Sequence, residues 1–349
     1  MTFRLSRPAV ATVVAAIFLA ACSFSPSPSG SPRTDQSFSA DGEDLVVYSG
    51  RTEELVGPII DRFSEESGVE VAVRYGDTAE MANLILTEGE NTPADVYLAQ
   101  DAGALGAVAA EGLLATLPDD VLDQVEERFR SIDGHWVGLS GRSRVVVYNT
   151  TNVDPADLPD TIFGFTDPEW SGRIGWAPTN GSFQSFVTAL RVLEGEDRAR
   201  EWLEGIQAND PNVYEGNNPA LEAVIAGEID VAFINHYYLM QRLAEDPDVP
   251  AANYFLPDGD PGALVNVAGV GVLDVTDRAD TAEHLVNFLL AEEAQAYFAE
   301  ETKEYPLAAG VEPDPALPPL RDLATPDIDL SDLADLEGTL ELLQEAGVL

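Results

Sequence analysis

Apolar and polar positions alternate with two different periods along the chain from about residue 44 onward. The apolar run at 45–48 has the length of a buried strand. The stretch at 53–66 carries apolar residues at helical spacing, with acidic residues in its first turn. Further strand-like and helix-like stretches follow at 69–75, 78–88, 95–98 and 101–111. This alternation predicts an α/β fold in which a parallel sheet carries helices on both faces.

A second block with the same alternation follows a strand at 145–148, which we place at a crossing between two domains. Its predicted elements are strands at 173–176 and 231–235 and helices at 183–193, 219–226 and from 236 onward. Strands at 262–265 and 267–273 are predicted to return to the first domain, before helices at 281–300 and near 333–346. The pattern therefore predicts two α/β parts connected more than once.

The first residues have the pattern of a bacterial export signal. Arg4 and Arg7 precede an apolar run at 9–20, which is short for a membrane-spanning helix. Cys22, the only cysteine, follows Leu-Ala-Ala as in a lipobox, where cleavage precedes an acylated cysteine; an ordinary signal peptide with a chance cysteine is the alternative. We expect an exported protein, anchored by lipid on the outer side of the cytoplasmic membrane.

The formal charge of −44, from 18 Lys+Arg against 62 Asp+Glu, limits the partners. So strong an acidic excess argues against nucleic acid and anionic lipid as ligands. Most of the acidic residues lie on the polar faces of predicted helices, so we interpret the excess as a solvated surface and not as a binding site. Contact with the membrane is expected through the lipid anchor alone.

Two adjacent tyrosines, Tyr237 and Tyr238, stand where the strand at 231–235 gives way to a helix. At such a junction both phenols can point to one place beyond the carboxyl end of the strand, where open α/β sheets bind ligands. Two phenolates form a hard, anionic oxygen donor pair that suits Fe(III), whose charge favours their ionisation. The alternative is that both tyrosine rings pack on the core and their hydroxyl groups are hydrated.

The Thr-Asn-Gly-Ser turn at 179–182 precedes a predicted helix. Its free backbone N–H groups and the positive end of the helix dipole make it a candidate seat for an anion. A purely structural N-cap explains the same residues equally well.

Sequence signatures of common enzymes are missing from the chain. It has no Gly-x-Ser-x-Gly elbow, no phosphate-binding loop and no His-Glu-x-x-His helix, and its one cysteine belongs to the lipobox. A hydrolase that uses a carboxylate pair stays open, because the number of acidic residues does not exclude it, although the sequence singles out no pair. We expect a binding protein without catalytic activity.

Several segments, in order along the chain, resemble the ferric-ion-binding proteins, the substrate-binding components of bacterial iron(III) ABC importers. The segments are Tyr48-Ser49-Gly50, Pro93-Ala94-Asp95-Val96, 139–148, 177–181, Asn235-His236-Tyr237-Tyr238, 260–265 and Glu304-Tyr305-Pro306-Leu307. The resemblance covers nearly all of the chain from about Leu45. It implies a two-lobed, type II periplasmic-binding-protein fold with hinge strands between the lobes.

The expected domain organisation combines this resemblance with the N-terminal pattern. We expect a lipoprotein signal peptide at 1–21 and a flexible tether at 22–43. The first lobe is expected at 44–141 and 265–317, the second lobe at 142–264, and a C-terminal segment packed on the second lobe at 318–349.

The resemblance places the paired iron-ligating tyrosines of the family on Tyr237 and Tyr238. The family's additional ligand positions, a histidine, a glutamate and in other members a third tyrosine, fall on Thr52, Gln100 and Phe183. Other oxygen atoms must therefore complete the coordination of the iron, and a synergistic anion, carbonate or phosphate, is expected. Residues expected to hold this anion or to support the ligands are Arg51, Thr52, Gln100, Asp101, Asn180, Gly181, Ser182, Asn217, Asn235 and His236.

The resemblance also implies a partner, the permease of an iron(III) importer, and we expect a monomer. The leading alternative keeps the fold and changes the ligand to an organic one, such as a thiamine-like molecule, a polyamine or a phosphonate. The tyrosine pair beside the anion turn favours a metal with an anion over an organic cation.

Overall fold

The computed structural model describes residues 44–308 and 310–349. The predicted lipid attachment at Cys22, the signal peptide and the tether lie outside the described residues. Within the described ranges, no helix is both long enough and apolar enough to cross a membrane.

The first strands form a parallel group at one end of a ten-stranded sheet, as the apolar pattern predicted. Strands β1 (Leu45–Ser49), β2 (Val71–Tyr75) and β3 (Val96–Ala99) are parallel, with β1 in the middle. Helices α1 (Glu53–Ser67), α2 (Thr78–Glu88) and α3 (Ala102–Ala110) follow these strands in turn. Each strand therefore ends, at its carboxyl end, next to the start of a helix.

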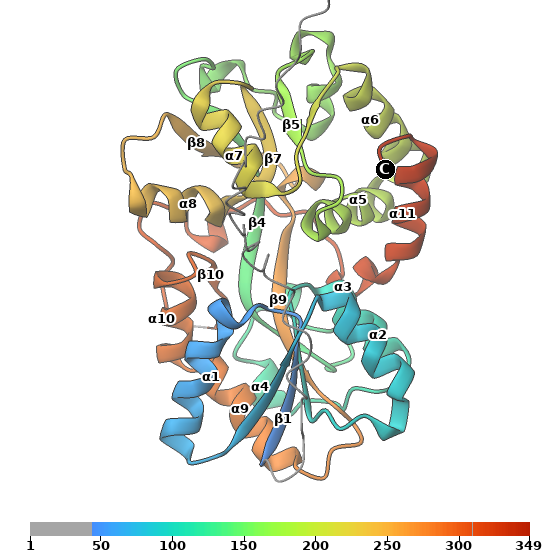
Figure 1. Ribbon diagram of the computed structural model, residues 1–349, viewed down its shortest axis with the longest axis vertical. Helices are drawn as coiled ribbons and strands as arrows, with labels where there is room; N and C mark the ends of the chain where they lie inside the picture. The colour runs from blue at the N-terminus through green and yellow to red at the C-terminus, as the bar shows by residue number, and fades with distance from the viewer. Residues whose placement is uncertain (1–43, 309) are drawn as a thin grey trace, which may run out of the picture. The chain divides into compact units, whose positions relative to one another are not determined.

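Two long antiparallel strands connect this group to a second one (Figure 1). Strand β9 (Val265–Val272) pairs with β3 on one side and with β4 (Val137–Asn149) on the other. The first half of β4 pairs with β9, and its second half, from Arg144 onward, pairs with β7 and β8. We call the part around β1, β2, β3 and β9 the first lobe, and the part around β7 the second lobe.

The second lobe repeats the strand–helix pattern. Strand β5 (Ile174–Trp176) is parallel to β6 (Asn212–Val213) and β7 (Val231–Asn235), and β8 (Ala251–Tyr254) is antiparallel to β4. Its helices are α5 (Gly181–Glu194), α6 (Glu196–Ala208), α7 (Asn217–Ala226) and α8 (His236–Glu245).

Aromatic side chains fill the core of the second lobe. Trp170, Trp176, Trp202 and Phe183 are almost fully buried and belong to one apolar cluster. Phe183 lies edge-on to Trp176, with ring centroids 5.5 Å apart. The position at which some relatives are expected to place a third tyrosine is thus occupied by a core residue.

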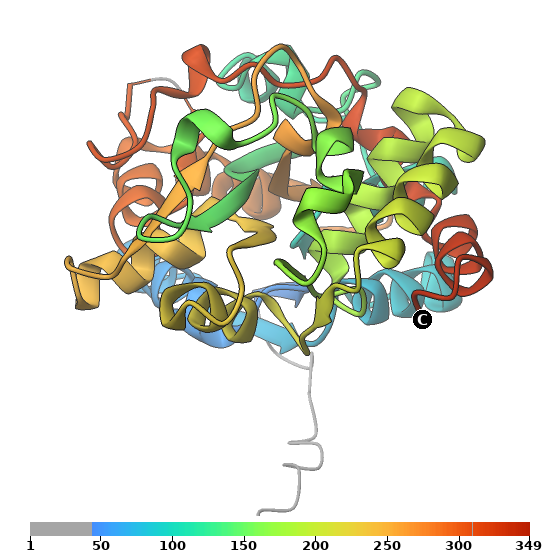
Figure 2. The same cartoon turned by 90° about the horizontal axis from the view of Figure 1, so that it is seen from above.

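The last part of the chain runs across both lobes. Helices α4 (Asp119–Leu122), α9 (Ala279–Leu290) and α10 (Glu292–Glu300) belong to the first lobe (Figure 1), and β10 (Tyr305–Pro306) pairs with β4. A short 3₁₀ turn at Leu330–Ala334 packs on α3, and α11 (Leu336–Glu345) packs on α5, beside which it lies in Figure 2. We call 330–345 the C-terminal strap.

Two predicted elements differ from the structure. The single helix predicted at 281–300 is two helices, because Ala291 between α9 and α10 adopts an extended conformation. The strand predicted at 262–265 is wrong at its start, where Pro261–Ala263 form a 3₁₀ turn capped by the carboxylate of Asp260. Proline supplies no backbone N–H to a sheet, and it suits the first position of such a turn.

Candidate metal-binding site

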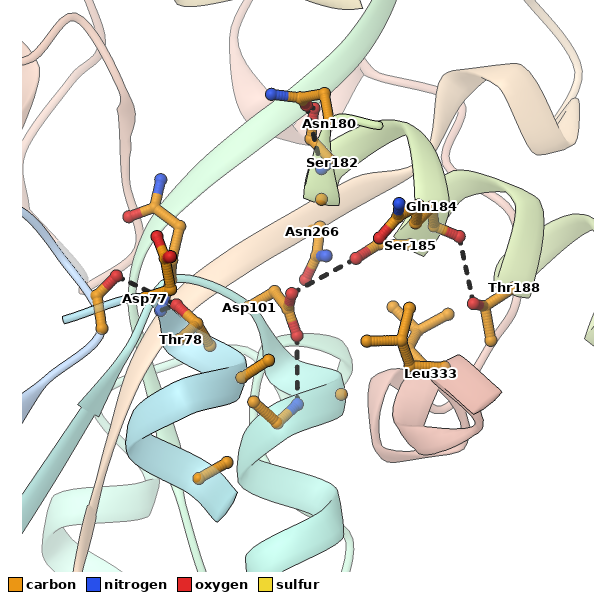
Figure 3. A pocket seen from close by; sticks show the side chains of 18 of the residues that line it. Asp77, Thr78, Asp101, Asn180, Ser182, Gln184, Ser185, Thr188, Asn266 and Leu333 are labelled. Atoms are coloured by element: carbon orange, nitrogen blue, oxygen red, sulfur yellow. Dashed lines mark hydrogen bonds between the residues drawn. The ribbon is translucent and has the colours of Figure 1, made fainter. Parts of the chain in front are cut away.

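A cavity of about 500 Å³ is lined by residues of both lobes. The first lobe contributes Gly50, Thr78, Gln100 and Asp101, which follow the carboxyl ends of its strands. The second lobe contributes the turn at 179–182, Asn235, Tyr237 and Tyr238. Figure 3 shows Asp77, Thr78 and Asp101 on one side, with Asn180, Ser182 and Ser185 opposite. Most of the residues that the sequence singled out therefore meet in one place.

Tyr237 and Tyr238 occupy the first turn of α8, directly after strand β7. Their rings are stacked, with centroids 4.2 Å apart and planes inclined by 28°. Tyr237 is 7% exposed, and Tyr238 is half-buried. Both line the cavity, so the phenols share one environment, as the junction predicted.

The surroundings of Tyr237 favour the neutral form of its phenol. Burial raises the pKa of Tyr237 well above 10.0, and a charge on Tyr238 raises it further, while Arg142 acts in the opposite direction. A bound cation replaces the lost hydration of the phenolate with a direct bond. Ionisation of the pair is therefore tied to the arrival of a cation.

Two arginines on β4 bring positive charge to this region: Arg142 to the cavity and Arg144 to its wall at Ser182. The sequence pattern did not single them out. They are two positions apart and share a face of the strand. Arg142 lines the cavity and donates to the backbone carbonyl of Gln100. Both side chains are at most 4% exposed, and the Nε of each has no partner. Two charges in an otherwise uncharged strand were the signal that could have found them.

Arg144 is held between the aromatic core and the turn at 179–182. Its guanidinium donates to the carbonyl of Phe233 at 2.7 Å and to Ser182 Oγ at 3.4 Å. It also lies over the rings of Phe183 and Phe186, 5.5 and 5.2 Å from their centroids. Burial lowers the pKa of Arg144, and a negative charge on Tyr238 raises it. A phenolate at Tyr238 and a charged Arg144 therefore stabilise each other.

The turn before α5 serves as a cap and lines the cavity at the same time. Asn180 Oδ1 accepts from the backbone N–H of Ser182 at 3.0 Å and from its hydroxyl group at 2.6 Å. The amide of Asn217, on α7, donates to Asn180 Oδ1 at 3.3 Å and to Ser182 Oγ at 3.2 Å. Asn217 Oδ1 is buried without a partner, and Gly181 is exposed in the cavity wall.

Asp101 connects the two lobes across the cavity. One carboxylate oxygen caps α3 by accepting from the N–H of Ala104 at 3.0 Å, and the other accepts from Ser185 on α5 at 3.3 Å (Figure 3). Gln100 and Thr78 complete this wall, since the Gln100 N–H donates to Thr78 Oγ1 at 3.1 Å. The lobes are thus already in contact.

Four of the residues predicted to bind the ligand or support its site do not line the cavity, and of these only Asn217 contacts the turn at 179–182. Arg51 is 1% exposed, does not line the cavity, and forms an ion pair with Glu304 at 3.0 Å. Thr52 is exposed to solvent outside the cavity. His236 is fully buried: its Nδ1 accepts from the N–H of Ser143 at 3.1 Å, and its Nε2 lies 3.1 Å from the carbonyl of Lys303. Both ring nitrogens are therefore occupied by the backbone.

The available donors restrict the metals that the cavity suits. In the described part of the chain, no group of three or more His, Cys, Asp or Glu residues is placed to hold a metal ion. The donors are two phenols and single carboxylates such as Asp101 and Asp77. An all-oxygen set with phenols suits a hard, highly charged cation and not zinc or copper.

Two α/β lobes that enclose a cavity between them define a solute-binding protein of the two-lobed type. The chain belongs to the bacterial extracellular solute-binding protein family, whose model matches residues 81–330.

Relatives of known name and structure cover nearly the whole chain. It is 33% identical over 317 residues to the Fe(3+)-binding periplasmic protein of Serratia marcescens, which covers 90% of this chain and 93% of that protein. Iron-bound HitA from Pseudomonas aeruginosa is 35% identical, with a TM-score of 0.81 over 87% of this chain and 99% of its own.

Two further relatives bear on the ligand. The Trichodesmium protein IdiA (FutA), in complex with iron and citrate, is 28% identical, with a TM-score of 0.76 over 87% of this chain and 99% of its own. A putative 2-aminoethylphosphonate-binding protein of Salmonella typhimurium is more distant, at 24% identity over 72% of this chain and 74% of that protein. These comparisons confirm the predicted type II fold, and the relatives named here are binding proteins, not enzymes.

Proposed function

We propose that this protein binds iron(III) outside the cytoplasm and delivers it to the permease of an ABC importer. The observation that carries the proposal is the stacked pair Tyr237 and Tyr238 at the wall of the cavity between the lobes. The Serratia protein, named as Fe(3+)-binding, and iron-bound HitA from Pseudomonas match 90% and 87% of this chain, and they support the proposal. In this proposal the two phenolates are the protein donors to iron.

An anion, carbonate or phosphate, is proposed to occupy further positions on the iron. Two phenolates leave most of the coordination sphere open, and an anion that binds both iron and protein closes it. Arg142 and Arg144 offer buried charge with unpartnered Nε atoms, and the turn at 179–182 offers the start of α5. Charged donors of this kind bind carboxylate-like anions through short, strong hydrogen bonds. We therefore assign to these two arginines the role that the sequence suggested for Arg51.

The experiment that tests the proposal is a titration of the purified protein with ferric nitrilotriacetate in the presence of bicarbonate. Iron(III) bound to phenolate gives a visible charge-transfer band. We expect this band in the wild type and its loss or strong bleaching in Tyr237→Phe and in Tyr238→Phe. Tyr254→Phe is the matched control, because its hydroxyl group donates to Asp160 and does not line the cavity. A full band in both cavity variants would remove iron from the site.

The same titration distinguishes iron binding from the alternative, in which the cavity binds an organic ligand. A protein that binds phosphonates or polyamines gives no visible band with iron. If it binds phosphonates, its intrinsic fluorescence responds to 2-aminoethylphosphonate instead. The tyrosine pair favours iron, because two phenolates form a hard, anionic oxygen donor pair that suits Fe(III).

Attachment through Cys22 is proposed for the location of the protein. Cys22→Ala is expected to release soluble protein from the cells, while iron binding by the two lobes stays the same. Protein that remains with the membrane after a salt wash would contradict the lipid anchor. A monomer is expected in either form, and sedimentation velocity measures it.

A further inference from the structure

The C-terminal strap contacts both lobes beside the cavity. Its first turn, Leu330–Ala334, packs on α3 of the first lobe, and its helix α11 packs on α5 of the second lobe (Figure 1). Only Asp335 separates the turn from the helix. A single residue provides no slack, so the strap connects the lobes a third time, in addition to the long strands β4 and β9.

The contact between the strap and α3 depends on two glycines. Gly103 and Gly106 are three positions apart and therefore share one face of the helix. A Cβ atom at Gly103 would lie 2.4 Å from the carbonyl oxygen of Leu333, and one at Gly106 would lie 2.7 Å from that of Ser331. The backbone of the strap thus lies directly on α3, and Leu330 and Leu333 are at most 4% exposed. A side chain at either glycine would push the turn away.

The other end of the strap is part of the second lobe. Leu343 is fully buried in the aromatic cluster of that lobe. Thr339 forms a buried hydrogen bond with Thr188 of α5 at 2.7 Å. Arg191, also on α5, donates to the carbonyl oxygen of Asp335 at 3.1 Å and to its carboxylate at 2.9 Å. Helix α11 is therefore expected to move with the second lobe.

The two ends of the strap are held by different forces. In the part of the chain that the structure describes, the hydrogen bonds between the strap and other helices all go to α5 and α6 of the second lobe. The turn at 330–334 meets α3 through van der Waals contact, and a gap of about 1 Å already removes much of that attraction. When the lobes separate, the contact with α3 is therefore the one that breaks at the lower cost.

We propose that residues 330–334 act as a clasp, which holds the lobes closed and leaves α3 when they open. The contact with α3 exists only while the lobes are together, so its free energy favours the closed arrangement and opposes the release of a bound ligand. For iron(III), this inference rests on the function proposed above, and the clasp then slows the loss of iron from the cavity. Gly106 does not line the cavity, so the clasp is open to mutation without a change at the tyrosine pair.

The first experiment measures iron release from Gly106→Ala. Iron-loaded protein is mixed with excess ethylenediaminetetraacetate, and the decay of the visible band gives the rate. We expect release to be roughly tenfold faster than in the wild type, because an extra methyl group in a close-packed contact weakens it by about that factor. Gly57→Ala in α1 is the matched control, since a Cβ atom there would meet the flexible side chain of Glu53 at 3.3 Å. An unchanged release rate in Gly106→Ala would overturn the clasp.

The second experiment shows which end of the strap leaves its lobe. A Cys22→Ala background has no cysteine, so a single introduced thiol is followed by its reaction with iodoacetamide. Leu330→Cys reports on the clasp and Leu342→Cys on α11, and both positions are at most 3% exposed. Without iron, we expect Leu330→Cys to react roughly tenfold faster than Leu342→Cys, because local opening exposes the clasp alone. Iron should slow the reaction of Leu330→Cys and leave that of Leu342→Cys unchanged.

Two results of the labelling would overturn the proposal. Equally slow reaction of both variants without iron would show that the strap stays on both lobes, and faster reaction of Leu342→Cys would show that α11 is the end that leaves. Adding Gly106→Ala to Leu330→Cys should speed its reaction in the iron-free protein, which tests the clasp independently of the metal. If no protein gives an iron band, the iron function fails, and this last comparison still decides whether the clasp exists.

Discussion

Arg51 and Glu304 form an ion pair with both side chains at most 1% exposed, and Arg51 Nη2 lies 3.0 Å from Glu304 Oε2. Ser140 on β4 joins them, donating to Glu304 at 2.5 Å and accepting from Arg51 at 3.0 Å. Burial raises the pKa of Glu304, but the charges of Arg51 and Arg142 outweigh burial and hold it below 4.5. The pair connects the loop after β1 with the strand β10 region, beside the long strand that links the lobes.

The first prediction is that Arg51→Ala acts on stability and not on the anion. Removing one partner leaves the Glu304 carboxylate buried and unpaired, which costs about 3–5 kcal/mol in the free energy of unfolding. Urea unfolding measures this loss, and the double variant Arg51→Met with Glu304→Gln should recover most of it. A stable Arg51→Ala protein whose iron band no longer responds to bicarbonate would return Arg51 to the anion site.

The second prediction concerns Arg142. We expect Arg142→Gln to reduce iron affinity in bicarbonate roughly tenfold, because a hydrogen bond to a charged group contributes about 1.5–3 kcal/mol. Competition with citrate, with and without bicarbonate, measures the change. Arg278→Gln serves as control, since Arg278 pairs with Asp95 away from the cavity. A bicarbonate response unchanged in Arg142→Gln would exclude this arginine from anion binding.

The third prediction is a steep pH dependence of iron binding. Burial holds the pKa of Tyr237 well above 10.0, so its phenol is neutral at pH 7 and must lose its proton when iron binds. Iron uptake should therefore release up to about two protons from the tyrosine pair, and affinity should fall as the pH drops. Calorimetry in buffers of different ionisation enthalpy counts these protons. The count should be smaller by about one in either tyrosine-to-phenylalanine variant that still binds iron.

The fourth prediction concerns stability in acid. Burial lowers the pKa of His236 to about 4. Between pH 6.5 and 4 the unfolded chain therefore binds a proton at this residue that the folded chain does not. The free energy of unfolding falls as the pH drops through this window, by on the order of 3 kcal/mol in total, and levels off below it.

His236→Gln provides the comparison for that prediction. Glutamine does not titrate, so its stability curve should lack the His236 contribution while the many carboxylates contribute equally to both proteins. Urea unfolding at pH 7, 5.5 and 4.5 separates the two curves. Parallel curves over this range would show that His236 is protonated in the folded state.

The sequence alone determined the local features of this protein. Strands and amphipathic helices are recognised by the spacing of their apolar residues, with periods of about 2 and 3.6 residues. Most elements of both lobes were therefore predicted. The tyrosine pair was also predictable, because its placement depends only on a strand ending at Asn235 and a helix starting at His236. The capping role of Asn180 was one of two interpretations that the sequence left open, and it is local too, since a cap is formed by neighbours in the chain.

Only the tertiary structure decided which partners the charged side chains have. Arg51 meets Glu304, 253 residues away along the chain, and nothing near Arg51 in the sequence distinguishes this ion pair from an anion site. Arg142 lies at the cavity and Arg144 beside the turn at 179–182, and their backbones pair with Asn266 on β9 and Asn235 on β7, two strands distant in sequence. The strap reaches the cavity after a long proline-containing segment. Contacts between distant segments depend on how the whole chain packs, and the pattern of nearby residues carries no record of them.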